Sequence, residues 1–195
     1  MKTTAIILAG GNGSRFLSDI PKQYVKLAGK PIIAYSITQF DKNEKVDEIV
    51  IVTQPEYKKT IEDIIRMDNI KKRIIIVNNG KTRQESSKNG VFACTDSTNK
   101  ILIHDAARPF VNQKIINDVI DALDEYDAVD VAIPATDTII EMEQGLINSI
   151  PDRNKILRGQ TPQGFKAGII KKAHQLAEID GVFNATDDCT LVLKY

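Results

Sequence analysis

The sequence has few cysteines, no excess of charge of either sign and no long apolar run, and each absence excludes a class of protein. The two cysteines, Cys94 and Cys189, form no C-x-x-C pair and have no neighbouring histidine, which argues against a disulfide framework and a zinc site. Lysine plus arginine and aspartate plus glutamate both number 26, so no net field favours nucleic acid or a membrane surface. We therefore expect a protein of the reducing cytoplasm, with no nucleic-acid partner and with anion sites that are built locally.

The apolar stretches are too short to cross a membrane, so we expect no membrane partner. The first of them, residues 5–9, is also shorter than a signal-peptide core and runs directly into glycines. A chain of 195 residues, of which 42% are apolar, is the right size to bury one core. We predict a single domain over residues 1–195.

Short apolar runs alternate with segments of helical period along most of the chain. The runs are continuous or β-branched, which is typical of buried strands in a parallel sheet, and they cover residues 5–8, 49–52, 74–77, 101–103 and 129–133. The helical segments cover residues 31–40, 55–67, 85–93, 115–123, 169–177 and 191–195. This alternation predicts an α/β fold, with a Rossmann-like, mainly parallel sheet flanked by helices.

The rhythm changes between residues 138 and 162, where short β-like pieces surround Gln144-Gly145 and Pro151. We predict a protruding β-arm over about residues 137–160. Such an arm needs something to pack against.

The strongest local signal comes directly after the first strand, in Leu8-Ala9-Gly10-Gly11-Asn12-Gly13-Ser14-Arg15, with Pro21-Lys22-Gln23-Tyr24 close behind. Glycines at the carboxyl end of a strand let backbone N–H groups approach phosphate oxygens, and Arg15 and Lys22 supply charge for a triphosphate. The alternative is a tight glycine turn with two solvated cations. Ligands of open α/β sheets bind at the carboxyl ends of strands, which favours the phosphate site.

Two commoner phosphate motifs do not fit. The dinucleotide fingerprint needs the spacing G-x-G-x-x-G and an acid after the second strand, but Phe16 and Thr53-Gln54 stand near those places. Gly80-Lys81-Thr82 resembles the end of a Walker A loop, yet Ile75 stands where that motif needs a glycine. A hydride-transfer enzyme and a P-loop are therefore disfavoured.

A second polar cluster follows another apolar strand, in His104-Asp105-Ala106-Ala107-Arg108-Pro109. Asp105 can hold Mg²⁺ against a triphosphate, and Arg108 can pair with Asp105 or with a phosphate. The alternative is a structural Asp–Arg pair. Both polar clusters fall at the same sheet edge, which predicts a cleft there. We expect His104 to be packed and hydrogen-bonded rather than catalytic, and Cys94 to be a small buried hydrophobe.

These patterns together resemble the cytidylyltransferases that make 4-diphosphocytidyl-2-C-methyl-D-erythritol and their relatives that make CDP-ribitol. The matching pieces run along the chain in the family's order: Leu8 to Arg15, Pro21 to Tyr24, Gly80 with Arg83 and Ser86, His104 to Pro109, Asp137-Thr138, Asp152-Arg153, Gln160 to Gln163, and Thr186 to Asp188. The resemblance implies a fold of the nucleotide-diphospho-sugar-transferase type and a reaction that joins CTP to an alditol phosphate and releases pyrophosphate.

The resemblance also implies roles for the matching residues. The catalytic cations would be Arg15 and Lys22. The nucleotide would be bound by Leu8, Ala9, Gly10, Gly11, Gly13, Arg15, Lys22, Gly80, Arg83 and Ser86. The acceptor would be bound by Asp105, Ala106, Arg108, Thr138, Arg153 and Thr161, with Asp105 near the Mg²⁺ or another divalent cation. The arm would reach a partner subunit, which implies a homodimer.

The proposed chemistry needs no dedicated general base, because the acceptor phosphate is already an anion at neutral pH. The protein has to neutralise charge and position the reactants in line, which explains why no Ser-His-Asp or Cys-His set is required.

The sequence departs from the family after Tyr195, where members continue with a strand and a turn that carry an Asn-Ile-Lys motif and then a closing helix. We expect that the sequence is a truncated piece of a longer chain. The alternative is a protein with a damaged acceptor site.

Three functions remain in competition. An alditol phosphate cytidylyltransferase is the first, and the segments Arg158 to Gln163 and Thr186 to Cys189 look more like its CDP-ribitol branch. A hexose 1-phosphate nucleotidyltransferase is the second, since its glycine loop is similar. A non-catalytic nucleotide-binding paralogue or scaffold is the third.

Overall fold

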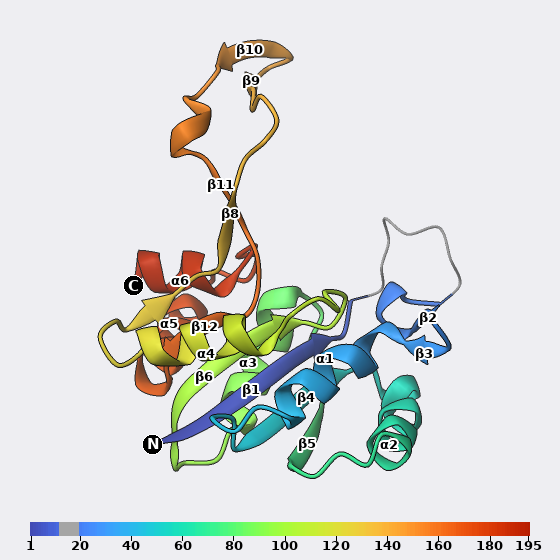
Figure 1. Cartoon of the computed structure of the whole chain (residues 1–195). Helices are drawn as coiled ribbons and strands as arrows, with labels where there is room; N and C mark the ends of the chain where they lie inside the picture. Colours follow the sequence, from blue (N-terminus) through green and yellow to red (C-terminus); the bar gives the residue numbers. More distant parts are fainter. Residues whose placement is uncertain (12–19) are drawn as a thin grey trace.

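A six-stranded sheet forms the centre of the protein (Figure 1). The computed structural model describes residues 1–11 and 20–195. From one edge to the other the strands are β5 (Arg73–Asn78), β4 (Glu48–Thr53), β1 (Lys2–Ala9), β6 (Thr98–Asp105), β12 (Gln163–Lys166) and β7 (Ala128–Val129).

The sheet has a parallel part and an antiparallel part. The strands β5, β4, β1 and β6 are mutually parallel, and their register places Leu8 beside both Val52 and Asp105. Their carboxyl ends therefore meet at one edge. Strand β12 pairs antiparallel with β6 on one side and with β7 on the other. The sheet is thus mixed but mainly parallel, and the α/β prediction is confirmed.

Helices cover both faces of the sheet. Successive side chains of a strand point to opposite faces, so a strand that is apolar along its length has to be covered on both. Ile7 of β1 packs in a cluster with α1 (Ile32–Asp41), α2 (Lys58–Met67) and α4 (Gln113–Ala122). Its neighbour Ile6 packs in a second cluster with α3 (Arg83–Ala93), α5 (Ala167–Ile179) and α6 (Asp188–Lys194). The core therefore lies on both sides of β1.

Short elements complete the body. Strands β2 (Lys26–Leu27) and β3 (Lys30–Pro31) form a small hairpin, and single 3-10 turns occur at η1 (Lys22–Tyr24) and η2 (Pro55–Tyr57). Three helices begin at side-chain caps, in which Thr82, Asn112 and Asp187 accept bonds from backbone N–H groups three residues later.

An arm stands off the body (Figure 1). Its stalk is the antiparallel pair β8 (Ala132–Pro134) and β11 (Leu157–Gly159). Its tip is the hairpin of β9 (Glu141–Glu143) and β10 (Leu146–Ser149), followed by η3 (Arg153–Lys155). Gln144 and Gly145 both have positive φ, as a two-residue hairpin turn requires.

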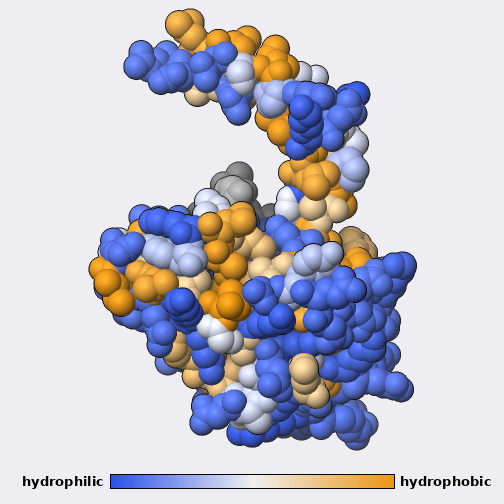
Figure 2. All heavy atoms as spheres, turned by 90° about the vertical axis from the view of Figure 1, so that its left-hand side faces the viewer, coloured by the Kyte–Doolittle hydropathy of each residue, from blue (hydrophilic) through white to orange (hydrophobic). Residues whose placement is uncertain are grey.

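The arm carries exposed apolar side chains, which Figure 2 shows as patches along the stalk and the tip. They are Ile133, Ile140, Met142, Leu146, Ile147, Ile150 and Leu157. Apolar area gathered in this way on one element marks a surface for association.

One strand prediction is wrong, because the run at residues 129–133 is not a single buried strand. Its first residue ends β7, and the chain then leaves the sheet so that Ile133 belongs to the exposed stalk. The short strand β12 was not expected. Among the described residues, no helix has the length and apolar character needed to span a membrane.

Candidate functional site

The side chain of Gln23 supports the start of the glycine turn that follows β1. This side chain is buried, and its amide Nε2 donates to the carbonyl oxygens of Ala9 at 2.7 Å and Gly11 at 2.8 Å. The described start of the turn is therefore held as far as Gly11, although Gly11 itself is exposed. The N–H groups of such a turn are suited to hold phosphate oxygens. Gly13 and Arg15 lie outside the described residues.

Gly10 lies against the turn that follows β5. A Cβ atom added at Gly10 would stand 2.3 Å from the Cβ of Asn79, a distance that no side chain tolerates. The amide of Asn79 in turn donates to the carbonyl oxygen of Gly80 at 3.0 Å. The absence of a side chain at Gly10 thus brings the glycine turn and the Gly80 turn together.

Ser86 closes the Gly80 turn. Its hydroxyl accepts from the Gly80 N–H at 3.0 Å and donates to the carbonyl of Thr82 at 2.9 Å. Glu85 fixes the same turn from outside, because its carboxylate accepts from the N–H of Lys81. The two residues expected to contact cytosine, Gly80 and Ser86, are therefore adjacent and rigidly held.

Lys22 is an exposed cation at the start of η1, close in sequence to the bond donor Gln23. Within the described parts of the chain its ammonium group makes neither a hydrogen bond nor an ion pair. An ammonium group without a protein partner is available to a bound anion.

Asp105 ends strand β6 beside the glycine turn. The next residue, Ala106, is buried and donates its N–H to the carbonyl oxygen of Leu8 at 3.0 Å, which ties the two polar clusters together. Asp105 Oδ2 lies 3.2 Å from Arg108 Nε, and Oδ1 lies 3.7 Å from Arg83 Nη2. Two arginines therefore flank one carboxylate at the edge of the sheet, where a phosphate can bind.

Arg83 is fixed by a buried partner. Its Nη1 donates to Oδ2 of Asp188 at 2.8 Å. Partial burial by itself would lower the pKa of Arg83, but the carboxylates of Asp188 and Asp105 raise that pKa above its usual value. Arg83 thus stays charged and faces the Asp105 side of the site.

His104 is buried and organises the turn around Asp105. Its Nε2 lies 3.1 Å from the carbonyl oxygen of Arg108, so Nε2 carries the proton. The Thr161 hydroxyl then donates to Nδ1 at 2.9 Å and accepts from the N–H of Asp105 at 3.2 Å. Burial lowers the pKa of His104 to about 4, which keeps the ring neutral. The expectation of a packed, hydrogen-bonded histidine is confirmed.

A hollow of about 180 Å³ opens at this cluster. Its walls include Arg83, Asp105, Arg108, Thr161, Thr186 and Asp187. Cations and carboxylates from α3, β6 and the turn before α6 thus surround one space. Its residues can bind and orient an anionic group.

Two of the expected acceptor residues lie elsewhere. Thr138 and Arg153 are exposed on the arm, where Arg153 donates to the carbonyl of Thr136 at 3.1 Å. Neither contributes to the walls of the hollow. Within one subunit, the structure brings together Asp105, Ala106, Arg108 and Thr161 but not the arm residues.

Sequence reasoning gave no role to Gln23, Asp188 or Gln163. Gln23 buttresses the glycine turn, and Gln163 accepts from the N–H of Asp188 through its side-chain oxygen. Each stands in a motif of the family resemblance, but their burial, which shows the role, comes from tertiary packing.

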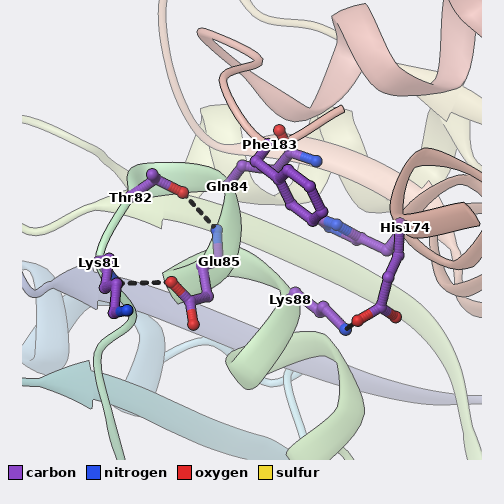
Figure 3. Close-up of a pocket in the computed structure, with 8 residues that line it drawn as sticks. Lys81, Thr82, Gln84, Glu85, Lys88, His174 and Phe183 are labelled. Carbon is purple, nitrogen blue, oxygen red and sulfur yellow. Dashed lines mark hydrogen bonds and ion pairs between the residues drawn. The ribbon is translucent and has the colours of Figure 1, made fainter. Parts of the chain in front are cut away.

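A second hollow, of about 320 Å³, lies behind the Gly80 turn between α3 and α5 (Figure 3). Thr82, Gln84, Lys88, His174 and Phe183 are among its lining residues. It shares no lining residue with the hollow at Asp105.

The described residues include no group of three His, Cys, Asp or Glu side chains that could hold a metal ion. Asp105 and Asp187 nevertheless both line the hollow. One or two carboxylates, with substrate phosphates as the other ligands, are what Mg²⁺ ordinarily takes. The site therefore fits a divalent cation that is held largely by a bound triphosphate.

Comparison with known proteins agrees with this geometry. The IspD family model, 2-C-methyl-D-erythritol 4-phosphate cytidylyltransferase, matches residues 3–195. The bifunctional ribulose 5-phosphate reductase/CDP-ribitol pyrophosphorylase Bcs1 of Haemophilus influenzae is 41% identical over 197 residues, which cover 99% of this chain but 41% of that protein. The chain thus spans less than half of this relative.

A 2-C-methyl-D-erythritol 4-phosphate cytidylyltransferase of Lachnospira eligens is 40% identical and is matched over 98% of this chain and 85% of its own length. A solved 4-diphosphocytidyl-2C-methyl-D-erythritol synthase from Anaerococcus prevotii superposes with a TM-score of 0.88 at 25% identity, covering 99% of this chain and 82% of that one. The chain belongs to the IspD family of cytidylyltransferases.

Proposed function

We propose that the protein transfers CMP from CTP to the phosphate of an alditol phosphate and releases pyrophosphate. The observation that carries this proposal is the joining of the two polar clusters by the bond between Ala106 and Leu8. It sets a glycine turn suited to a triphosphate beside an Asp105 flanked by two arginines, in a chain of the IspD family.

In the proposed reaction an oxygen of the acceptor phosphate attacks the α-phosphorus of CTP, the bond to the β-phosphate breaks, and pyrophosphate leaves. The acceptor oxygen is already anionic, so the protein has to position and neutralise rather than remove a proton. Lys22, together with Arg15, would stabilise charge on the attacked phosphate, and Gly80 and Ser86 would contact the cytosine. Arg108 would orient the acceptor phosphate.

A divalent cation such as Mg²⁺ would neutralise the triphosphate, with Asp105 as a protein ligand. The pairing of Asp105 with two arginines supports an anion-binding role for the same place. Binding of the acceptor phosphate would draw those arginines towards the phosphate and free the carboxylate.

We also propose a homodimer in which the arm completes the partner's site. The exposed apolar side chains of the arm support this, and so do Thr138 and Arg153, which lie far from the hollow of their own subunit. We further propose that the protein acts in the cytoplasm, and its use of CTP as a substrate supports this location.

Of the two acceptors, we propose ribitol 5-phosphate. The Haemophilus influenzae relative, whose name includes CDP-ribitol pyrophosphorylase, supports this choice, since it is 41% identical and is matched over 99% of this chain. The 2-C-methyl-D-erythritol 4-phosphate cytidylyltransferases are similar to the same degree, at 38–41% identity. The choice therefore calls for a direct comparison of acceptors.

The test is release of pyrophosphate by the purified chain with CTP and Mg²⁺, with ribitol 5-phosphate and 2-C-methyl-D-erythritol 4-phosphate compared at equal concentration. Preference for ribitol 5-phosphate supports the proposal, and preference for the other acceptor corrects the substrate. Turnover only with UTP or GTP and a hexose 1-phosphate would show that the protein is a hexose 1-phosphate nucleotidyltransferase instead. Nucleotide binding without any turnover would identify a non-catalytic paralogue.

A further inference from the structure

We propose that Asp188, which has no role in the mechanism above, positions Arg83 for binding of the acceptor phosphate. The inference rests on the proposed function, because it assigns Arg83 to the acceptor side of that reaction. Asp188 is a positioning residue and contacts no substrate.

Asp188 is a completely buried carboxylate at the start of α6. Its Oδ2 accepts from Arg83 Nη1 at 2.8 Å, and its Oδ1 accepts from the Ser87 hydroxyl at 2.6 Å. Its backbone N–H donates to Gln163 Oε1 at 3.2 Å. These bonds hold both the side chain and the backbone of Asp188 in one position, and they fix the position of its partners as well.

His174 approaches the same carboxylate from α5. Its Nε2 lies 3.3 Å from Asp188 Oδ1, but the geometry is not that of a hydrogen bond, and neither ring nitrogen has a hydrogen-bond partner in the described structure. Figure 3 shows the imidazole ring beside Phe183, on the side of the second hollow. His174 therefore lies against Oδ1 of Asp188, whereas Arg83 holds Oδ2 at the shorter distance of 2.8 Å.

The consequence for Arg83 follows from the shape of the guanidinium group. With Nη1 bound to Asp188, the other terminal nitrogen faces Asp105 Oδ1 at 3.7 Å, and the side chain stays 28% exposed at the wall of the hollow. One edge of the planar group is thus anchored and the other is presented to the site. An arginine side chain that is held in this way loses less freedom when it binds an anion.

Burial of a carboxylate by itself raises its pKa, but His174, Arg83 and Ser87 together lower the pKa of Asp188, so the group is charged. A charged group of this kind is costly to place in a protein interior unless it is paired. The carboxylate accepts hydrogen bonds from Ser87 and from Arg83. Arg83 is the partner that connects it to the hollow.

A purely structural role for Asp188 would produce a different result from a positioning role. Loss of structure lowers the fraction of active molecules, so kcat falls while both KM values stay the same. Loss of position raises the KM for the acceptor and leaves the KM for CTP almost unchanged. The effect of a positioning role on the acceptor KM also disappears in a protein that already lacks Arg83.

The experiment is a double-mutant cycle of Asp188→Asn and Arg83→Gln in the pyrophosphate-release assay. Asp188→Asn keeps the size of the side chain and removes its charge. We expect kcat/KM for the acceptor to fall on the order of 10- to 100-fold in Asp188→Asn compared with the wild type. When Asp188→Asn is added to Arg83→Gln, we expect kcat/KM to fall by less than about 3-fold compared with Arg83→Gln alone. Retention of kcat/KM within about 2-fold, or fully additive losses, would overturn the proposal.

The matched control is Glu178→Gln, which neutralises a half-exposed carboxylate of α5 paired with Lys88 at 2.6 Å. It should change kcat/KM by less than about 2-fold. If Asp188→Asn does not fold, Arg83→Lys tests the same positioning role. This substitution keeps a cation that can pair with Asp188, but it removes the planar guanidinium group that can contact Asp188 with one edge and the site with the other. Wild-type kcat/KM in Arg83→Lys would equally overturn the proposal.

The position of Arg83 can also be measured without turnover. In a crystal structure of Asp188→Asn, we expect the guanidinium group to move away from Asp105, and an unmoved Arg83 would overturn the inference. If the wild-type chain shows no CTP-dependent turnover, the proposed function fails while this structural test still decides the role of Asp188.

Discussion

The body and the arm hold their proposed site residues in opposite ways. In the body, Asp105 is flanked by Arg83 and Arg108, and its backbone N–H is bound by Thr161, which is bound in turn by His104. On the arm, Thr138 and Arg153 are exposed, and Leu146 is 75% exposed. One half of the proposed site is formed before any substrate binds, whereas the other half would depend on the proposed association of two subunits.

The difference indicates how the work of catalysis is divided. A site that must stabilise developing charge benefits from groups that are already in place. A site that must grip a small acceptor from both sides can take its second wall from a partner subunit. Each of the following substitutions affects one half and leaves the other intact.

Lys22→Ala should have the largest effect, because it removes a preorganised charge from the body half. We expect turnover to fall at least ~100-fold, as for loss of one group that stabilises a transition state. Steady-state kinetics with CTP and the preferred acceptor give the measurement, and circular dichroism serves as the folding control. Since Lys22 is exposed and makes no pair in the described structure, the fold should be unchanged. Near-normal turnover would remove Lys22 from the mechanism.

Leu146→Glu should affect the arm half alone. Burying a leucine side chain contributes roughly 1.5–3 kcal/mol, so a charge at this position should weaken the dimer by 10-fold or more, on the order of that free energy. Light scattering during gel filtration measures the oligomeric state, and activity at low protein concentration should fall in parallel.

The control for the arm is Asn148→Lys, which adds a charge to the same strand at an exposed polar position. It should preserve the dimer. A Leu146→Glu protein that stays dimeric and active would show that the tip of β10 is no interface.

Gly10→Ala should damage the junction between the glycine turn and the Gly80 turn. The added methyl group would stand 2.3 Å from the Cβ of Asn79, so backbone has to shift, at a cost of about 1–3 kcal/mol in the free energy of unfolding. Urea denaturation measures this loss. Gly11→Ala is the matched control for stability, since a Cβ atom there meets no atom of the described residues within 4 Å. Equal stabilities would contradict the close packing at Gly10.

Acid should loosen the body half through His104, with the smallest effect for a change of one pH unit. The pKa of this residue is lowered to about 4 by burial, so the unfolded chain takes up its proton near the ordinary value of 6.5 while the folded chain does not. Stability is therefore complete above that ordinary value and is lost as the pH falls towards 4, by about 1 kcal/mol for each pH unit.

The measurement for His104 is the free energy of unfolding of the wild type and of His104→Gln at several pH values. Subtracting the two curves cancels the titration of all other groups. The difference should shrink as the pH falls. A difference that does not vary with pH would show that His104 has no lowered pKa.

The contrast between the body and the arm also explains which strands could be predicted from the sequence and which could not. The strands β1, β4 and β6 each contain a continuous apolar run that is buried on both faces, so their pattern identified the α/β class and the sheet edge of the candidate site. Strand β12 could not be found in this way, because Gln163 and Gly164 are buried by tertiary packing rather than by apolar character. The run at residues 129–133 misled for the reverse reason, since Ile133 is apolar but belongs to the stalk.

Within the site, motifs identified the residues but not the connections between them. The family resemblance pointed to Asp105, Arg83 and Arg108, and the structure brings these three together. The partnership of Arg83 with Asp188 spans 105 residues of sequence, and no local pattern predicts it. Assignments of individual residues to nucleotide or acceptor remain predictions that the substitutions above would test.

The two roots of the arm give this molecule a mechanical property. One root follows β7, and the other passes from β11 through Gln160 and Thr161 into β12. Gln160 donates its N–H to Val131 across the roots and accepts from Arg108, while Thr161 holds the N–H of Asp105. The arm is therefore a lever whose fulcrum is the proposed acceptor site, so a force that a partner subunit exerted on the tip would reach Arg108 and Asp105 directly.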